Sequence, residues 1–353
     1  MSGPEDGPDV PDAVGDDAGP PPGETFGAKR KKKKLPLTLI KVVISGLLIA
    51  WTVKNAEFGK VIDAMKGAKL PWLLAAFSLV FVGSLVTATR WRGLLAAHGH
   101  RMSVFYLFQS CVVARFVGQF LPTTIGGDAL RGWDTWRAGT PKALSLAILV
   151  IDRLVGFLAL ICFALGALMF SPALNERFPL LRPWVVLGTA CLLFGTWIVF
   201  FPTPRLMSFV NGILDRFPKK LRSPFEKVLR ALTSFQGKTG QLGRAFVLSV
   251  LLQVNVVTFY WLIAQSLSLP IDYADFYLIV PIFLFIMLVP VSINGIGVRE
   301  AACVALLTAY AGVEQAQAVA FAWLEYLLFL SYGLLGGVVY AFRKEGAPEP
   351  DPA

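Results

Sequence analysis

Long apolar segments recur along the chain and are separated by short polar stretches. Several hold about twenty residues with almost no charge, the length that an α-helix needs to cross about 30 Å of hydrocarbon. This pattern predicts an all-α, polytopic transmembrane helix bundle and excludes a soluble enzyme of one or two domains. The segments run near residues 37–53, 70–91, 104–121, 143–170, 184–201, 245–269, 276–291, 298–310 and 316–342.

The distribution of charge divides the chain into a membrane domain and two tails. Residues 1–28 contain seven acids and no Lys or Arg, so we expect a disordered acidic tail there. Residues 344–353 form a second tail, and residues 29–343 form the transmembrane domain. The net charge is +10 overall although both tails are acidic. The basic surplus of the membrane domain indicates an anionic partner, and lipid headgroups are the first candidate.

Basic residues also predict the orientation. Residues 29–34 are all Lys or Arg and directly precede the first apolar segment. A nucleic-acid role is open for such a run, but its position favours the cytoplasmic face of an anionic membrane. The amphipathic loop 202–244 carries nine Lys and Arg against two acids, and it is expected in the cytoplasm. We therefore expect a multi-pass protein of the bacterial inner membrane, with both termini in the cytoplasm.

Nine single crossings would place loop 202–244 on the wrong side of the membrane. The conflict disappears if residues 104–139 enter from the cytoplasm and return, and if residues 276–310 enter from the outside and return. We therefore expect about six full spans plus two oppositely oriented re-entrant helical hairpins. Broken helices that meet at mid-membrane are typical of transporters.

Each predicted hairpin has a polar, glycine-rich break. In the first, Pro122 ends a helix, Gly126 and Gly127 allow a tight bend, and Asp128 is placed to cap a new helix that carries Arg131. In the second, the turn Asn294–Gly295 is followed by a new helix. The polar residues of the second break are Ser292, Asn294, Gly295, Gly297, Arg299 and Glu300.

Charges also occur inside apolar segments. Placing one at the bilayer centre costs about 2.5–3.5 kcal/mol, so these groups must pair, face water or bind a charged ligand. One interpretation is that they only pair and lock the bundle. The other is that they line a site for an anionic headgroup, because guanidinium binds phosphate through two parallel hydrogen bonds. The candidate residues for headgroup binding are Arg115, Gln119, Thr124, Gly126, Gly127, Asp128, Arg131, Asp152, Arg153, Asn294, Gly295, Gly297, Arg299, Glu300 and Glu325.

Four smaller expectations follow from the same patterns. Trp72 and Trp91 bracket one segment as interfacial residues do. The spacing of Gly333 and Gly337 permits close helix contact. Residues 58–65 form an amphipathic stretch that is expected in the headgroup plane, as is 225–235. The cysteines are expected to be buried free thiols, and the two histidines to lie at the surface without a metal; these six residues are Cys111, Cys162, Cys191, Cys303, His98 and His100.

Three motifs in this order resemble the flippase-like family of bacterial and archaeal membrane proteins, which includes the transmembrane region of lysylphosphatidylglycerol synthetase. They read LPTTIGGDALRGW, DRLVGFLAL and PVSINGIGVREAA, and the likeness covers about residues 35–342. The resemblance implies a helix bundle with re-entrant segments and a role in handling lipids. It also implies that the motif residues are the functional ones. The synthetase also has a soluble aminoacyl-transferase domain, and we expect this chain to lack that activity.

We therefore expect a non-enzymatic protein that binds an anionic phospholipid or polyprenyl phosphate and moves it between leaflets, without cofactor, metal or nucleic acid. A first alternative is a membrane-embedded transferase acting on a lipid-linked substrate, which would need a carboxylate cluster facing water. A second is an accessory subunit that docks a soluble lipid-synthesis enzyme. The sequence leaves open the lipid, the direction, the energy source and the oligomeric state.

Overall fold

The computed structural model describes residues 58–120, 126–170, 233–288, 295–308 and 311–343, with residue 292 and scattered positions between 183 and 229. Every regular element within these ranges is helical, which confirms the all-α prediction for this part of the chain. The predicted segment 37–53, both tails, the basic run and most of 184–201 lie outside the described residues. So do Cys191, most of 225–235 and two candidate site residues, Thr124 and Asn294.

Within the described ranges, four helices are long and apolar enough to cross a membrane. They are α3 (Leu70–Ala96), α6 (Lys142–Phe170), α11 (Thr239–Ser266) and α15 (Gln315–Phe342). At about 1.5 Å per residue each exceeds the hydrocarbon thickness and leaves room for tilt. They correspond to four of the six predicted full spans.

The helices of the two predicted hairpins are too short to cross alone. The first pair is α4 (Val104–Phe120) and α5 (Gly126–Arg137). The second begins with the 3₁₀ turn η1 (Tyr273–Asp275) and α12 (Phe276–Leu288), and continues with α13 (Val298–Cys303) and the π-helix η2 (Val304–Thr308). The longest is about 25 Å, short of a 30 Å core. Both segments are broken as predicted, whereas their entry from opposite faces stays a prediction.

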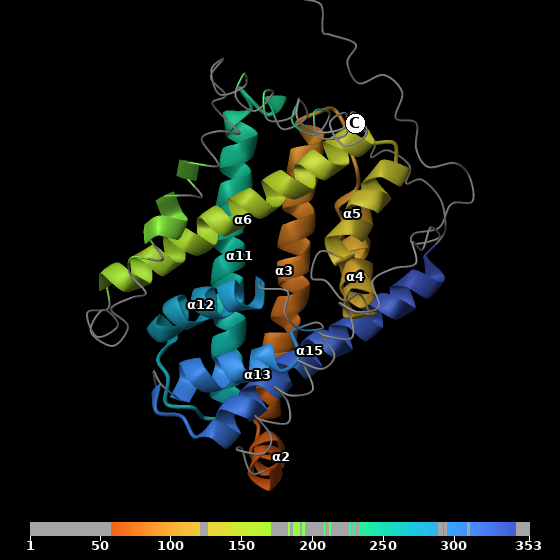
Figure 1. Ribbon diagram of the computed structural model, residues 1–353. Helices are drawn as coiled ribbons and strands as arrows, with labels where there is room; N and C mark the ends of the chain where they lie inside the picture. Colours follow the sequence, from red (N-terminus) through yellow and green to blue (C-terminus); the bar gives the residue numbers. More distant parts are fainter. Residues whose placement is uncertain are drawn as a thin grey trace, which may run out of the picture.

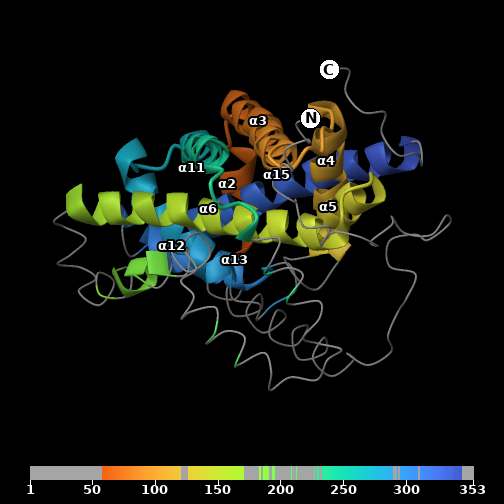
Figure 2. The same cartoon turned by 90° about the horizontal axis from the view of Figure 1, so that it is seen from above.

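Helices α3 and α11 form an antiparallel pair that runs side by side through the molecule, and α6 and α15 cross it obliquely (Figure 1). At one end His98 hydrogen-bonds Ser234, with 2.7 Å between Nε2 and Oγ. At the other end the Lys69 N–H donates to the Ser266 carbonyl at 2.8 Å. Figure 2 shows α12 and α13 on the far side of α6 from this pair. Because α6 and α15 cross the pair formed by α3 and α11, the charged side chains inside the bundle lie between crossing helices.

Glycines let the helices of the first hairpin pack at backbone distance. A Cβ at Gly127 would lie 2.6 Å from the Ala114 carbonyl oxygen, so α5 is in direct contact with α4. On α15, a Cβ at Gly336 would lie 2.3 Å from the Val112 carbonyl oxygen of α4. Gly333 and Gly337 also face α4, which confirms the predicted close contact of this helix. The glycines thereby hold α4 closely against both α5 and the last span, α15.

The amphipathic helix α2 (Phe58–Lys66) packs its apolar face on α15. Its Val61 is fully buried, and Phe58 contacts Trp323 of α15 edge to face at 5.8 Å. The sequence pattern does not reveal this apolar surface of α15, and the position of residues 58–65 in the headgroup plane stays a prediction. Of the amphipathic stretch 225–235, Phe235 is described and is also fully buried.

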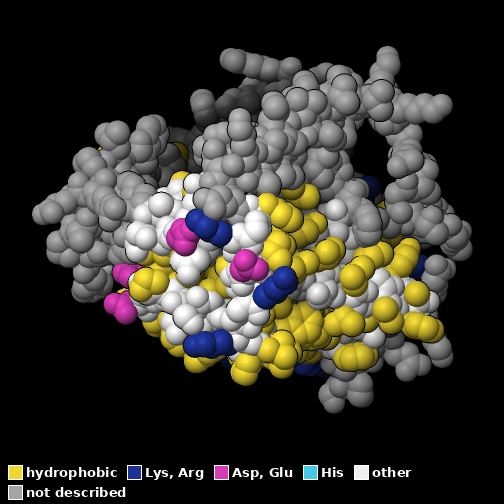
Figure 3. Space-filling view, turned by 90° about the horizontal axis from the view of Figure 1, so that it is seen from below, with side chains coloured by type: hydrophobic (Ala, Val, Ile, Leu, Met, Phe, Trp, Pro, Cys, Tyr) yellow, Lys and Arg dark blue, Asp and Glu magenta, His cyan; other side chains and the backbone are white. Residues whose placement is uncertain are grey.

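Apolar side chains cover much of the outer surface, as expected of a membrane domain. Figure 3 shows a face on which hydrophobic side chains spread over one half, while Lys, Arg, Asp and Glu gather in the other. Cys162 is exposed on this kind of surface and Cys111 is half-buried, so the expectation of uniformly buried thiols is wrong. Cys303 is buried as predicted. A membrane helix can leave a thiol on its outer side because lipid solvates it.

Candidate functional site

Charged side chains from α3, α5 and α6 meet inside the bundle in what we call the arginine cluster. Its core is Asp152, whose Oδ1 accepts a 2.7 Å hydrogen bond from Arg90 Nε. Arg90 Nη1 also donates to Ser249 Oγ of α11 at 2.5 Å. All three residues are buried, so this series of hydrogen bonds joins three long helices. The cluster comprises Arg90, Asp128, Arg131, Asp152 and Arg153.

Asp128 holds the outer part of the arginine cluster. Its Oδ2 accepts from Arg153 Nε at 2.8 Å and from Arg153 Nη2, and its Oδ1 lies 3.3 Å from Arg131 Nη1. The Arg153 side chain is 44% exposed, whereas that of Asp128 is 17% exposed. Helix α5 begins at Gly126, so Asp128 lies in the first turn and is not the predicted cap. Its carboxylate is engaged by guanidinium rather than by backbone.

Arg131 is the buried guanidinium between the two aspartates. Its Nη1 lies 3.7 Å from Asp152 Oδ2, and its guanidinium carbon lies 4.1 Å from the centre of the Trp91 ring. Arg131 Nε and Nη2 are buried and have no hydrogen-bond partner in the described part of the chain. Trp91 itself is buried beneath this cation, so its predicted interfacial role is wrong. A buried polar edge without a partner is costly, and it is therefore a candidate contact for a ligand.

A second group, the glutamate cluster, joins α11, α13 and α15. Arg299 Nε lies 2.9 Å from Glu325 Oε2, and the Tyr260 hydroxyl donates to Glu325 Oε1 at 3.0 Å. The Gly297 N–H donates to Glu300 Oε2 at 2.7 Å, which secures the start of α13. Gly295 and Gly297 have φ of +77° and +86°, so the sharp turn before α13 needs glycine. The cluster comprises Tyr260, Arg299, Glu300 and Glu325.

Arg115 of α4 lies between the two clusters. It interacts electrostatically with Glu325 of one and Asp128 of the other. Its guanidinium carbon lies 4.6 Å from the centre of the Phe329 ring, and Arg115 as a whole is exposed. Gln119, one turn later, donates through Nε2 to the Phe329 carbonyl at 3.4 Å. The break of the first hairpin and the last span therefore share one polar region.

A third group of charged and polar side chains, which we call the Asp134 clamp, centres on Asp134 of α5 and lies away from these two clusters. Asp134 Oδ2 accepts from Ser110 Oγ at 2.6 Å and from Arg343 Nη1 at 2.8 Å. The Tyr106 hydroxyl donates to the Asp134 carbonyl at 3.1 Å. These bonds join the ends of α4, α5 and α15. The pair is fully matched in charge, so its arrangement is that of a structural clamp.

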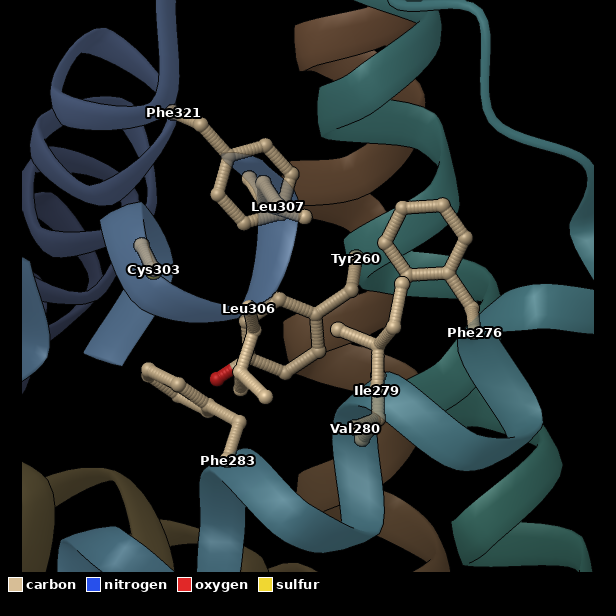
Figure 4. A pocket seen from close by; sticks show the side chains of 9 residues that line it. All are labelled: Tyr260, Phe276, Ile279, Val280, Phe283, Cys303, Leu306, Leu307 and Phe321. Carbon is tan, nitrogen blue, oxygen red and sulfur yellow. The ribbon is translucent and has the colours of Figure 1, made fainter. Parts of the chain in front are cut away.

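The cavity shown in Figure 4 is apolar. Its side chains converge from α11, α12, α13, η2 and α15, and the Tyr260 ring connects its wall to the glutamate cluster. Its volume of about 10 Å³ barely admits one water molecule. It therefore has no room for a headgroup. It is lined by Tyr260, Phe276, Ile279, Val280, Phe283, Cys303, Leu306, Leu307 and Phe321.

The histidines lie at the junction of α3 and α11 and are partly exposed, in agreement with the expected surface position. The His98 ring stacks edge to face on Phe235 at 4.2 Å, and the nearby Lys238 ammonium donates to the Ala97 carbonyl. Burial, and then the charge of Lys238, lower the pKa of His98, so its imidazole is neutral at pH 7. Among the described residues no three His, Cys, Asp or Glu side chains converge as metal ligands do.

The structure gathers the described candidate residues into these two clusters and their connection. The first motif contributes Asp128 and Arg131, the second Asp152 and Arg153, and the third Arg299 and Glu300. Gly295 and Gly297 shape the turn before α13, whereas Gly126 and Gly127, predicted to form a tight bend, lie in the first turn of α5, where Gly127 lets that helix contact α4. Sequence reasoning missed Arg90, Tyr260 and Asp134. Arg90 carries no distinct signal, since a charge near the end of an apolar segment normally reaches the headgroups.

Comparison with known proteins gives two matches. Residues 38–335 match the family of the lysylphosphatidylglycerol synthase TM region. The chain is also 20% identical over 249 residues to a UPF0104 membrane protein of Methanocaldococcus jannaschii, and this match covers 67% of the chain and 74% of that protein. The family match includes both clusters and both breaks, and it is to a membrane region alone.

Proposed function

Because the chain belongs to the family of the lysylphosphatidylglycerol synthase transmembrane region, we propose that it binds the phosphate of an anionic lipid and moves that lipid between leaflets. The family establishes a polytopic membrane protein. The lipid and its movement are inferred from the two charge clusters. A phosphate-bearing headgroup is the ligand that guanidinium recognises best in a dry environment.

The observation that carries the proposal is the incomplete pairing of Arg131. This guanidinium is buried within the bundle, lies 4.1 Å from the centre of the Trp91 ring, and is left with two N–H groups that no described residue accepts. A pair that served only to lock helices would have its donors satisfied, as those of the Asp134 clamp are. The arginine cluster also has three guanidinium groups against two carboxylates, which leaves one positive charge for an anion.

The two clusters give the lipid two stations along the bundle. Arg115 interacts with acids of both, so a phosphate that leaves Arg131 meets a cation on the way to Arg299. Gly127 lets α5 contact the backbone of α4 beside the first station, and the positive φ of Gly297 turns the chain beside the second. We expect the headgroup to pass between these stations while the acyl chains stay in the bilayer.

The proposal is tested by lipid translocation in proteoliposomes. The full chain is reconstituted with a fluorescent phosphatidylglycerol, and loss of fluorescence on adding an impermeant quencher measures the lipid reaching the outer leaflet. The variants are Arg131→Gln, Arg153→Gln and Arg299→Gln, and Arg101→Gln in the exposed loop after α3 is the matched control. The cluster variants should lose translocation by at least about tenfold, as expected for removal of one charged hydrogen-bonding group.

Folding is checked separately by gel filtration and thermal unfolding. Arg153 is half exposed, so Arg153→Gln keeps the fold even if the buried Arg131→Gln does not. Translocation at the wild-type rate in folded Arg131→Gln and Arg299→Gln would refute the proposal. Movement that is equal with and without the wild-type protein would refute it too.

A further inference from the structure

Asp128 occupies the position that a phosphate would take. Its carboxylate lies between the forks of two arginines, with Arg153 donating twice to Oδ2 and Arg131 Nη1 near Oδ1. A carboxylate and a phosphate present two oxygens to guanidinium in the same planar way. The chain therefore fills its own candidate anion site with an internal anion.

We infer that Asp128 is a built-in competitor, which an arriving lipid phosphate displaces from Arg153 and Arg131. The inference rests on the proposed function and adds a mechanism of binding and release to it. When no lipid is bound, Asp128 neutralises the forks. When the phosphate binds, it takes over their donors and gains the free Nε and Nη2 of Arg131 as well.

The exchange suits a carrier because the number of charges facing the forks changes little. A guanidinium inside a membrane is costly without a counter-ion, so a site with no internal anion would hold its ligand too tightly to release it. With Asp128 present, each departing phosphate is replaced by the carboxylate. Release then costs little, and the empty site never leaves the forks exposed to hydrocarbon.

The exchange needs only a side-chain rotation. The backbone of α5 is fixed at this point, because a Cβ on Gly127 would already collide with the Ala114 carbonyl. The Asp128 side chain, by contrast, is 17% exposed beside the half-exposed Arg153, so it has a path to solvent. Asp152 has no such freedom, since Arg90 fixes one of its oxygens and its side chain is only 6% exposed. Asp128 is therefore the exchangeable anion of the cluster.

The test measures binding to the purified full chain in detergent. The probes are short-chain phosphatidylglycerol, short-chain phosphatidylcholine and inorganic phosphate, so that lipid headgroup and free phosphate are told apart. The variants are Asp128→Asn and Asp128→Ala, and Asp134→Asn on the same helix is the matched control. If the forks are free of Asp128 for about a tenth of the time, its removal tightens binding of phosphatidylglycerol about tenfold.

The outcomes separate this inference from the proposed function. Tighter binding in either folded Asp128 variant, with wild-type affinity in Asp134→Asn, supports the competitor. Unchanged or weaker binding in a folded Asp128 variant overturns it, while binding by the wild type leaves the proposed function standing. If the wild type binds none of the lipids, the proposed function fails. If tightening is equal for inorganic phosphate, the site is one for free phosphate and the lipid part of the inference is overturned.

Discussion

At the scale of single residues, exposure divides the interior charges into fixed and exchangeable ones. The side chains of Arg90 and Asp152 are each 6% exposed and satisfy each other, whereas Arg153 is 44% exposed. Breaking a buried pair leaves an uncompensated charge, and breaking an exposed pair costs little. Under the proposed exchange, the buried pair serves structure and the more exposed pair serves ligand binding.

This division predicts opposite effects on stability. Arg90→Met removes one partner of the buried pair and leaves the Asp152 carboxylate to the longer, 3.7 Å contact with Arg131 Nη1, so it should destabilise the fold by about 3–5 kcal/mol. Arg153→Gln, the control, should change stability by less than about 1 kcal/mol. Chemical unfolding in detergent micelles measures both. Equal stability of Arg90→Met and the wild type would show that the pair does not hold these helices together.

Sequence reasoning found the residues of the three motifs but not their partners. Arg131 is conspicuous because it follows a polar, glycine-rich turn, and Asp152 because it interrupts an apolar segment. Arg90 is not, since a charge near the end of an apolar segment normally reaches the headgroups. The interfacial position predicted for Trp91 is wrong for a related reason. Its neighbour in space is Arg131, and that contact depends on how α3 and α5 pack. Tyr260 carries no signal that separates it from other core aromatics.

At the scale of elements, small residues decide where helices meet. Gly336 of α15 packs on the Val112 carbonyl, so a methyl group there collides with backbone that cannot move aside. Gly336→Ala should therefore destabilise by about 1–3 kcal/mol, as overpacking does, and should slow translocation by displacing α4. Gly243→Ala on α11 is the control, because a Cβ there meets open space and should be neutral or stabilising by up to about 1 kcal/mol. Thermal unfolding compares them, and an unaltered Gly336→Ala protein would contradict the close contact.

The breaks of both hairpins were predictable, and their detailed capping was not. Pro122 and the glycines predict an interruption wherever the chain folds, since their restrictions are local. Whether Asp128 caps α5 depends on the first helical residue, which is Gly126, and on the arginines that engage its carboxylate instead. The same limit applies to α2, whose apolar face was predictable and whose partner, α15, was not.

At the scale of the molecule, the antiparallel pair α3 and α11 places charge unevenly at its two ends. The end where α3 stops and α11 starts carries Arg101, Lys238 and Arg244, and the starts and ends of neighbouring helices add more cations. At the opposite end, four carboxylates balance the three lysines. The first end also carries Arg137, Lys142 and Arg343; the opposite end carries Lys60, Lys66, Lys69, Asp63, Asp272, Asp275 and Glu314.

This asymmetry predicts the orientation in the membrane. Excess Lys and Arg stay in the cytoplasm, so the end with Arg101 should face inward and the end with Asp272 outward. Taken alone, the lysines near residues 60–69 argue against this orientation, but the same end of the pair carries four carboxylates, one of which, Glu314, lies 3.7 Å from Lys60 Nζ. In a cysteine-free background, an impermeant maleimide added to intact cells should label Asp272→Cys and spare Arg101→Cys, which reacts only after the cells are opened. Labelling of Arg101→Cys in intact cells would contradict this orientation. It would show that the bundle is inserted the other way round, with loop 202–244 outside despite its nine cations.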